Sequence, residues 1–233
     1  IGPVGFYIRT QIDETPDFKK TVANIAVKTP LRDVLIKGHV SLLLAIGVVA
    51  GATAFNYVHK LYMPIYALKQ LHIAATSSYL GALMTGITLM IMAPVFGGLS
   101  DQYGRFRVLT IALLITGFSS YPMFVLLNTF PSLSTLLMVQ AIVGVLIAAC
   151  LGPIPAMLAD IFPTSIRGTG LALSYNFSVT LFGGFAPLIV TWMIDATGNK
   201  LAPSFYVMAT VLVSVMAIIC LGRRMRGISP AAS

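Results

Sequence analysis

The stretch GGLSDQYGRFR, Gly97–Arg107, lies between two long apolar runs and holds three charged residues and three glycines. Charge is scarce elsewhere, because only 9% of the 233 residues are Asp, Glu, Lys or Arg, whereas a soluble domain carries about 25%. With 57% hydrophobic residues, the chain has too little polar surface to cover a globule in water. A segment that crosses a bilayer must satisfy its own backbone hydrogen bonds, so we expect an all-α integral membrane protein.

Six apolar segments are each long enough to cross the hydrocarbon core as a helix, which takes about 20 residues. They cover residues 39–66, 77–96, 108–127, 133–158, 168–194 and 203–221. The connections between them are short: residues 69–76, 97–107, 128–132, 161–167 and 195–202. The stretch at 97–107 is therefore expected to form the turn between the second and third spans.

The segments outside the spans complete the predicted organisation. Residues 9–38 form the one long polar segment, which we expect to be a cytoplasmic loop with one or two short amphipathic helices. Residues 1–8 are apolar and are interpreted as the end of a preceding membrane helix. Residues 39–222 are then a six-helix bundle, and residues 223–233 are a cytoplasmic tail.

Lysine and arginine positions indicate the orientation, because cytoplasmic loops are enriched in both. If the polar segment lies inside, the inner segments hold twelve of the 15 basic residues: Arg9, Lys19, Lys20, Lys28, Arg32, Lys37, Arg105, Arg107, Arg167, Arg223, Arg224 and Arg226. Lys60, Lys69 and Lys200 remain outside. We expect both ends of the chain on the cytoplasmic side of a bacterial inner membrane. The net charge of +8 is thus assigned to these loops and not to nucleic-acid binding.

Individual residues of the 97–107 turn have predicted structural roles. Gly97 and Gly98 are expected to allow close helix approach, and Gly104 to permit a tight turn. Asp101 is expected to cap a helix start or to pair with a nearby cation. The simpler alternative is a positively charged reverse turn, in which Arg105 only fixes the topology.

The residue order G-x-L-S-D-x-x-G-R resembles the signature loop of the major facilitator superfamily. The matching residues are Gly97, Leu99, Ser100, Asp101, Gly104 and Arg105, while Gln102 and Phe106 replace usual basic residues. The resemblance implies that Asp101 engages a neighbouring helix end and helps to close an inner gate.

A second stretch, residues 155–189, resembles the metabolite:proton symporter branch of that superfamily, through Asp160, Phe162, Pro163, Arg167, Gly183, Gly184 and Pro187. The resemblance implies that the six spans are helices seven to twelve of a twelve-helix carrier. The chain would then be a C-terminal half whose partner is the N-terminal six-helix half. The implied activity is proton-coupled transport of citrate, 2-oxoglutarate, shikimate, proline or betaine.

Polar residues inside the spans are candidates for substrate binding, because such groups need partners or a water-filled cavity. Asn56, Tyr57, His59 and Lys60 cluster in the outer half of the first span, and Asn56, His59 and Lys60 have the spacing of one helix face. Lys60 would suit an anionic carboxylate, or it extends to the membrane interface. His59 would carry the coupled proton, or it is an interfacial residue.

Three further polar residues lie in later spans: Gln140 in the fourth, and Tyr175 and Asn176 in the fifth. They either line the same cavity as Lys60 or bond to adjacent helices. Asp160 and Arg167 flank the inner turn after the fourth span. They either pair with each other or engage Asp101 and Arg105 in a gate, unless Arg167 is topological only.

Glycine and proline positions predict close packing and helix breaks. Gly47 with Gly51, and Gly144 with Ala148 and Gly152, are spaced four apart, which allows helices to approach closely. Pro153 and Pro155 are expected to bend the inner end of the fourth span. The group Gly183, Gly184 and Pro187 is expected to loosen the fifth span near its middle.

The sequence argues against several other classes of protein. It contains no H-E-x-x-H motif, no nucleotide-binding loop and no convincing nucleophile with a base, so we expect neither an enzyme nor a cofactor. Cys150 and Cys220 lie in apolar runs, where a metal site is not expected. The remaining alternative is a six-span membrane scaffold without transport activity.

Overall fold

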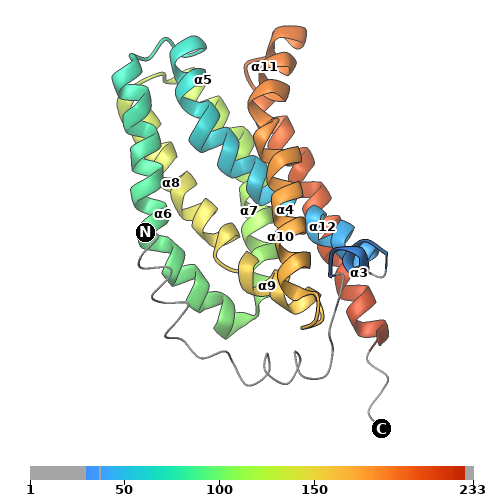
Figure 1. Ribbon diagram of the computed structural model, residues 1–233. Coiled ribbons are helices and arrows are strands. Elements are labelled where there is room, and N and C mark those ends of the chain that lie inside the picture. The colour runs from blue at the N-terminus through green and yellow to red at the C-terminus, as the bar shows by residue number, and fades with distance from the viewer. Residues whose placement is uncertain (1–29, 37, 229–233) are drawn as a thin grey trace, which may run out of the picture.

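The computed structural model describes residues 30–36 and 38–228, and every regular element in those residues is helical (Figure 1). A short helix, α3 (Pro30–Ile36), lies in the predicted polar loop. The predictions for residues 1–8 and for most of the loop lie outside the described residues. Six helical rods follow, and all six are long and apolar enough to cross a membrane. The six-span prediction is confirmed.

The first three rods contain four α-helices and one π-helical turn. The first rod is α4 (His39–Tyr57), the π turn η1 (Val58–Tyr62) and α5 (Met63–Lys69). The second is α6 (Ala75–Tyr103), and the third is α7 (Arg105–Thr129). The second rod thus extends seven residues beyond its predicted end at residue 96.

The last three rods contain two breaks that the sequence predicted. The fourth rod divides at Gly152 and Pro153 into α8 (Leu133–Leu151) and α9 (Ile154–Ile161). The fifth consists of α10 (Arg167–Ser178), the π turn η2 (Val179–Gly184) and α11 (Ala186–Thr197). The sixth, α12 (Ala202–Ile228), continues into the predicted tail. The bend near Pro153 and the loosened middle of the fifth span are both confirmed.

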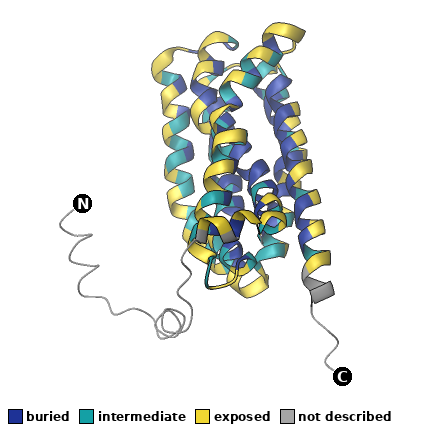
Figure 2. Cartoon of the chain, turned by 45° about the vertical axis from the view of Figure 1, so that its right-hand side comes forward, coloured by how far each residue is buried: buried dark blue, intermediate teal, exposed yellow. Residues whose placement is uncertain are grey.

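The rods run side by side as a bundle, with α5 and the end of α11 at one end and α9 and α3 at the other (Figure 1). The most extensive contacts join α6 to α8, and α12 to α4 and α7. Buried residues lie on the faces of the rods that point into the bundle, and exposed residues lie on the outer faces and at the ends (Figure 2). The core is aromatic and aliphatic, and its largest fully buried side chains include Tyr66, Phe55 and Phe124.

Glycines bring the most closely packed rods together. A Cβ atom on Gly51 would stand 2.8 Å from the Cα of Val211 in α12, and one on Gly144 would stand 2.9 Å from the carbonyl oxygen of Thr85 in α6. Ser214 closes the α4–α12 contact, because its hydroxyl accepts from the Gly51 N–H at 2.7 Å and donates to the Gly47 carbonyl at 2.8 Å. The predicted packing glycines are confirmed in both rods.

Candidate functional site

A cavity of about 200 Å³ opens beside the first rod, lined by Asn56, Tyr57, Lys60 and Leu61. The first two residues end α4 and the other two belong to η1. Lys60 is exposed, while Asn56 and Tyr57 are half-buried. The cavity therefore presents one ammonium group with three donors, one amide and one phenol. Three of the six predicted substrate residues meet here.

His59 does not share this cavity. Its side chain is fully buried, and its ring lies 4.6 Å from that of Phe55 and 5.3 Å from that of Phe124, centroid to centroid. Neighbouring helix residues point about 100° apart. Asn56 and Lys60 therefore face the cavity, whereas His59 faces the core. The prediction of one common face for these residues is wrong for His59.

Gln140 also lies inside the bundle. It is fully buried in α8, and its side-chain amide donates to the main-chain carbonyl of His59 at 2.9 Å. Of the two alternatives that the sequence left open, the geometry shows the bond to an adjacent helix. Tyr175 and Asn176 lie exposed on α10, and neither lines the Lys60 cavity. The Asn176 amide donates to the Ala172 carbonyl of its own helix at 2.8 Å.

The second π turn, η2, packs against the side chain of Tyr57. A Cβ atom on Gly183 of η2 would stand 2.7 Å from the Tyr57 ring and 2.7 Å from the Thr53 methyl group. The glycine therefore lets the fifth rod approach the first at the edge of the cavity. The sequence predicted the break in the fifth rod but missed η1. Pro64, just after η1, was the available signal, since proline lacks the N–H that an unbroken helix needs.

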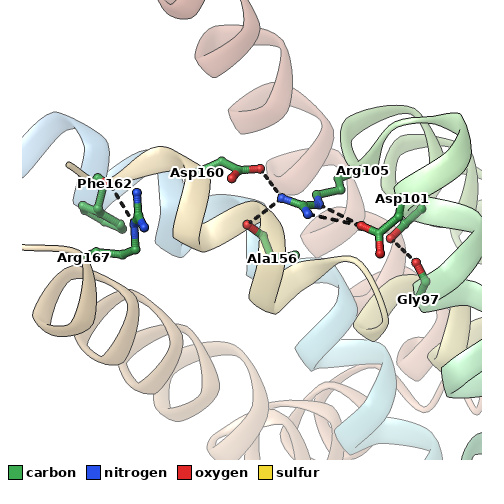
Figure 3. A network of polar contacts seen from close by, with 8 residues as sticks. Gly97, Asp101, Arg105, Ala156, Asp160, Phe162 and Arg167 are labelled. Carbon is green, nitrogen blue, oxygen red and sulfur yellow. Dashed lines mark hydrogen bonds and ion pairs between the residues drawn. The ribbon is translucent and has the colours of Figure 1, made fainter. Parts of the chain in front are cut away.

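At the α9 end of the bundle, one arginine bridges three helices (Figure 3). Arg105, the first residue of α7, donates from Nη1 to Asp160 Oδ2 of α9 at 2.6 Å and from Nη2 to Asp101 Oδ1 of α6 at 3.2 Å. A weaker contact joins Nη1 to the Ala156 carbonyl at 3.5 Å. Asp101 and Asp160 thus share the guanidinium group of Arg105, and we call these three residues the Arg105 cluster.

The chain reverses at this end in a single residue. Gly104 separates α6 from α7 and has φ 95° and ψ 126°, a backbone conformation that residues with a side chain rarely adopt. The predicted role of Gly104 is confirmed, and the reversal lies within the predicted turn, but the predicted extent of that turn over residues 97–107 is wrong. The charged residues of this stretch lie at the end of α6 and the start of α7. They are in contact with water there, although both segments are helical.

Gly97 has a smaller part in packing than expected. A Cβ atom on Gly97 or Gly98 would contact nothing within 4 Å, whereas one on Gly152 would stand 3.1 Å from the Gly97 main-chain nitrogen. The close approach therefore depends on Gly152. The Gly97 carbonyl accepts a hydrogen bond from the Ser100 hydroxyl at 2.7 Å.

Arg167 stands apart from the Arg105 cluster. Its Nε–H points to the Phe162 carbonyl at 3.4 Å, between α9 and α10 (Figure 3). Asp160 therefore engages Arg105 across the bundle and not Arg167 across its own turn. Among the described residues, no three His, Cys, Asp or Glu side chains are grouped so that they could hold a metal ion.

Comparison with known proteins agrees with this architecture. Residues 20–232 match the Major Facilitator Superfamily. The chain is 32% identical to a citrate-proton symporter of Klebsiella pneumoniae, over 96% of this chain and 50% of that protein. It is 28% identical to a proline/betaine transporter of Escherichia coli, over 100% of this chain and 49% of that protein. No solved structure matches the chain.

The chain belongs to the major facilitator superfamily, in the branch that contains metabolite:proton symporters. It spans about half the length of the curated relatives that it matches. These relatives are transporters and not enzymes.

Proposed function

We propose that this chain is the C-terminal half of a proton-coupled symporter for a small organic solute, and that the solute is a carboxylate such as citrate or 2-oxoglutarate. The observation that carries the proposal is the cavity in which Lys60 lies beside Asn56 and Tyr57. An ammonium group bonds a carboxylate more strongly than a neutral donor does. The similarity to a citrate-proton symporter supports the same solute class.

The exposed faces of two rods support a missing partner half. In the most apolar stretches of the second and fifth rods, only 11% and 28% of the residues are buried, against 44–56% in the other four. Faces of this extent need either lipid or another helical bundle against them. The solute would bind between the two halves near the middle of the bilayer, and rocking of the halves would alternate access.

The Arg105 cluster would act at the cytoplasmic end as part of an inner gate. The gate would comprise Gly97, Asp101, Gly104, Arg105 and Asp160, together with Arg167, which lies at the start of α10 and apart from the Arg105 cluster. Opening would require α6, α7 and α9 to separate or to move together, because Arg105 joins all three. The distribution of basic residues supports this orientation, with both ends of the chain inside and the chain in a bacterial inner membrane.

A zwitterion is the nearest competing solute, because several relatives are proline/betaine transporters. Proline and betaine each carry a carboxylate, so Lys60 would bond them too, but their cationic group would need a partner from the other half. A scaffold without transport is not favoured by these relatives.

Uptake into proteoliposomes tests the proposal. The full-length protein that carries this chain is reconstituted, and uptake of labelled citrate, 2-oxoglutarate and betaine is measured with and without an inward proton gradient. We expect gradient-driven uptake of one carboxylate. Uptake of betaine alone would support the zwitterion carrier, and failure of all three solutes would contradict the carboxylate proposal.

A further inference from the structure

The two π turns share one arrangement of proline and carbonyl. A π-helical turn pairs each carbonyl with the N–H five residues later, as Thr180 does with Phe185 at 3.3 Å in η2. The residue five after His59 is Pro64, and the residue five after Phe182 is Pro187. Proline has no N–H. In the π register, therefore, each turn contains one carbonyl that the main chain of its own rod leaves unpaired.

A side chain from another rod donates to each of these carbonyls. The Gln140 amide of α8 reaches the His59 oxygen at 2.9 Å, and the Tyr206 hydroxyl of α12 reaches the Phe182 oxygen at 2.7 Å. Both donors come from sequence positions more than 20 residues away, at separations of 81 and 24. The same solution thus occurs twice, with different donors on different helices.

Both donors are held in place. Gln140 is fully buried, and its main-chain carbonyl accepts from the Thr85 hydroxyl of α6 at 3.1 Å, whereas its side-chain Oε1 has no partner among the described residues. Only 9% of the surface of Tyr206 is exposed. A buried amide or phenol is costly unless it hydrogen-bonds, and a buried carbonyl without a partner is equally costly. Each donor–carbonyl pair therefore stabilises the π register of its turn.

We infer that Gln140 and Tyr206 are positioning residues that hold η1 and η2 in the π form and thereby shape the Lys60 cavity, an inference whose link to the solute rests on the proposed function. Lys60 belongs to η1, and Tyr57 immediately precedes it. Gly183 of η2 packs on the Tyr57 ring. Loss of either π turn would therefore rotate or displace a side chain that lines the cavity.

A double-mutant comparison in the full-length protein tests the inference without any solute. Tyr206→Phe removes only a hydroxyl group, and Gln140→Leu removes the amide. Hydrogen exchange by mass spectrometry follows peptides over residues 58–66 and 179–189. We expect each substitution to speed exchange at its own turn by about three- to tenfold, the range that one net hydrogen bond accounts for.

The prolines supply the decisive comparison. Pro187→Ala restores an N–H for Phe182, and Pro64→Ala restores one for His59. We therefore expect Tyr206→Phe to add little to Pro187→Ala, and Gln140→Leu to add little to Pro64→Ala. Additive effects, or exchange unchanged by Tyr206→Phe, would overturn the inference. Tyr79→Phe is the control, because Tyr79 is exposed on α6.

A transport measurement then separates positioning from general stability. In the same variants we expect KM for the transported solute to rise about three- to tenfold with Vmax little changed. A fall in Vmax alone would contradict a positioning role. If the unsubstituted protein takes up none of citrate, 2-oxoglutarate and betaine, the proposed carboxylate function fails, while the exchange comparison still decides whether Gln140 and Tyr206 hold the π turns.

Discussion

Arg105 Nη1 lies 2.6 Å from Asp160 Oδ2, closer than the 3.2 Å that separates its Nη2 from Asp101 Oδ1. The Asp160 side chain is also less exposed than that of Asp101, at 47% against 64%. Charge-assisted hydrogen bonds strengthen as they shorten and as water is excluded. The bond from α7 to Asp160 of α9 is therefore stronger than either of the two bonds to Asp101 of α6, which Nη2 and Nε donate at 3.2 and 3.3 Å.

We predict that Asp160→Asn reduces uptake more than Asp101→Asn does, while neither changes the free energy of unfolding by more than about 1 kcal/mol. Exposed ion pairs contribute little to stability, so the main effect falls on the gate. Uptake assays and thermal unfolding check the two parts. Arg107→Gln is the matched control because Arg107 lies outside the cluster. Equal uptake for both aspartate variants would contradict the ranking.

Gly183→Ala is expected to destabilise the protein by about 1–3 kcal/mol, the usual cost of overpacking. The new Cβ would stand 2.7 Å from both the Tyr57 ring and the Thr53 methyl group. Gly184→Ala is the control, since its Cβ would meet nothing closer than 3.8 Å. Thermal unfolding of the two variants decides the point, and similar melting temperatures would show that the contact is easily relieved.

Gly104→Ala is expected to destabilise the protein by about 1–3 kcal/mol, because it forces a side chain onto a backbone with φ 95°. Gly98→Ala, six residues earlier in the same stretch, lies within α6 and meets nothing within 4 Å. Since alanine favours a helix, that substitution is expected to be neutral or stabilising. The comparison is made by chemical or thermal unfolding. A destabilising Gly98→Ala with a neutral Gly104→Ala would contradict the single-residue turn.

His59→Phe is expected to leave folding intact or to stabilise it slightly, and to preserve gradient-driven uptake. Both ring nitrogens of His59 are buried without a hydrogen-bond partner in the described part of the chain, which is unfavourable for a polar group. The surroundings, Phe55 and Phe124, suit an aromatic ring. Measurement of uptake over a range of pH tests this. Loss of proton coupling in a folded variant would return His59 to the proton pathway.

The sequence predicted the six rods well because each is a long apolar segment, and apolar length is the signal that a bilayer imposes. It also predicted the breaks at Pro153 and near Gly183, since proline and glycine act on the local backbone. Helix ends were less accurate. The residues of Gly97–Tyr103 are polar or small enough to suggest a turn, yet they continue α6 because one glycine suffices for the reversal.

The candidate site was predictable only in part, because the direction of a side chain depends on the helix register. Asn56 and Lys60 meet as their spacing suggested, and Tyr57 joins them, but the boundary between core and cavity falls between His59 and Lys60. The partner of Gln140 could not be inferred, because the orphaned His59 carbonyl exists only in the π register. Likewise, spacing alone did not distinguish Arg105 from Arg167 as the partner of Asp160.

The most direct test of the central claim is the apparent KM for gradient-driven citrate uptake by the full-length protein with Lys60→Ala, beside Lys69→Ala. Both lysines are exposed on the first rod, but only Lys60 lines the cavity. Since a charged hydrogen bond is at stake, we predict that Lys60→Ala raises KM at least about tenfold and that Lys69→Ala leaves it unchanged. Uptake with an unaltered KM in a folded Lys60→Ala protein would contradict the account and place the solute elsewhere.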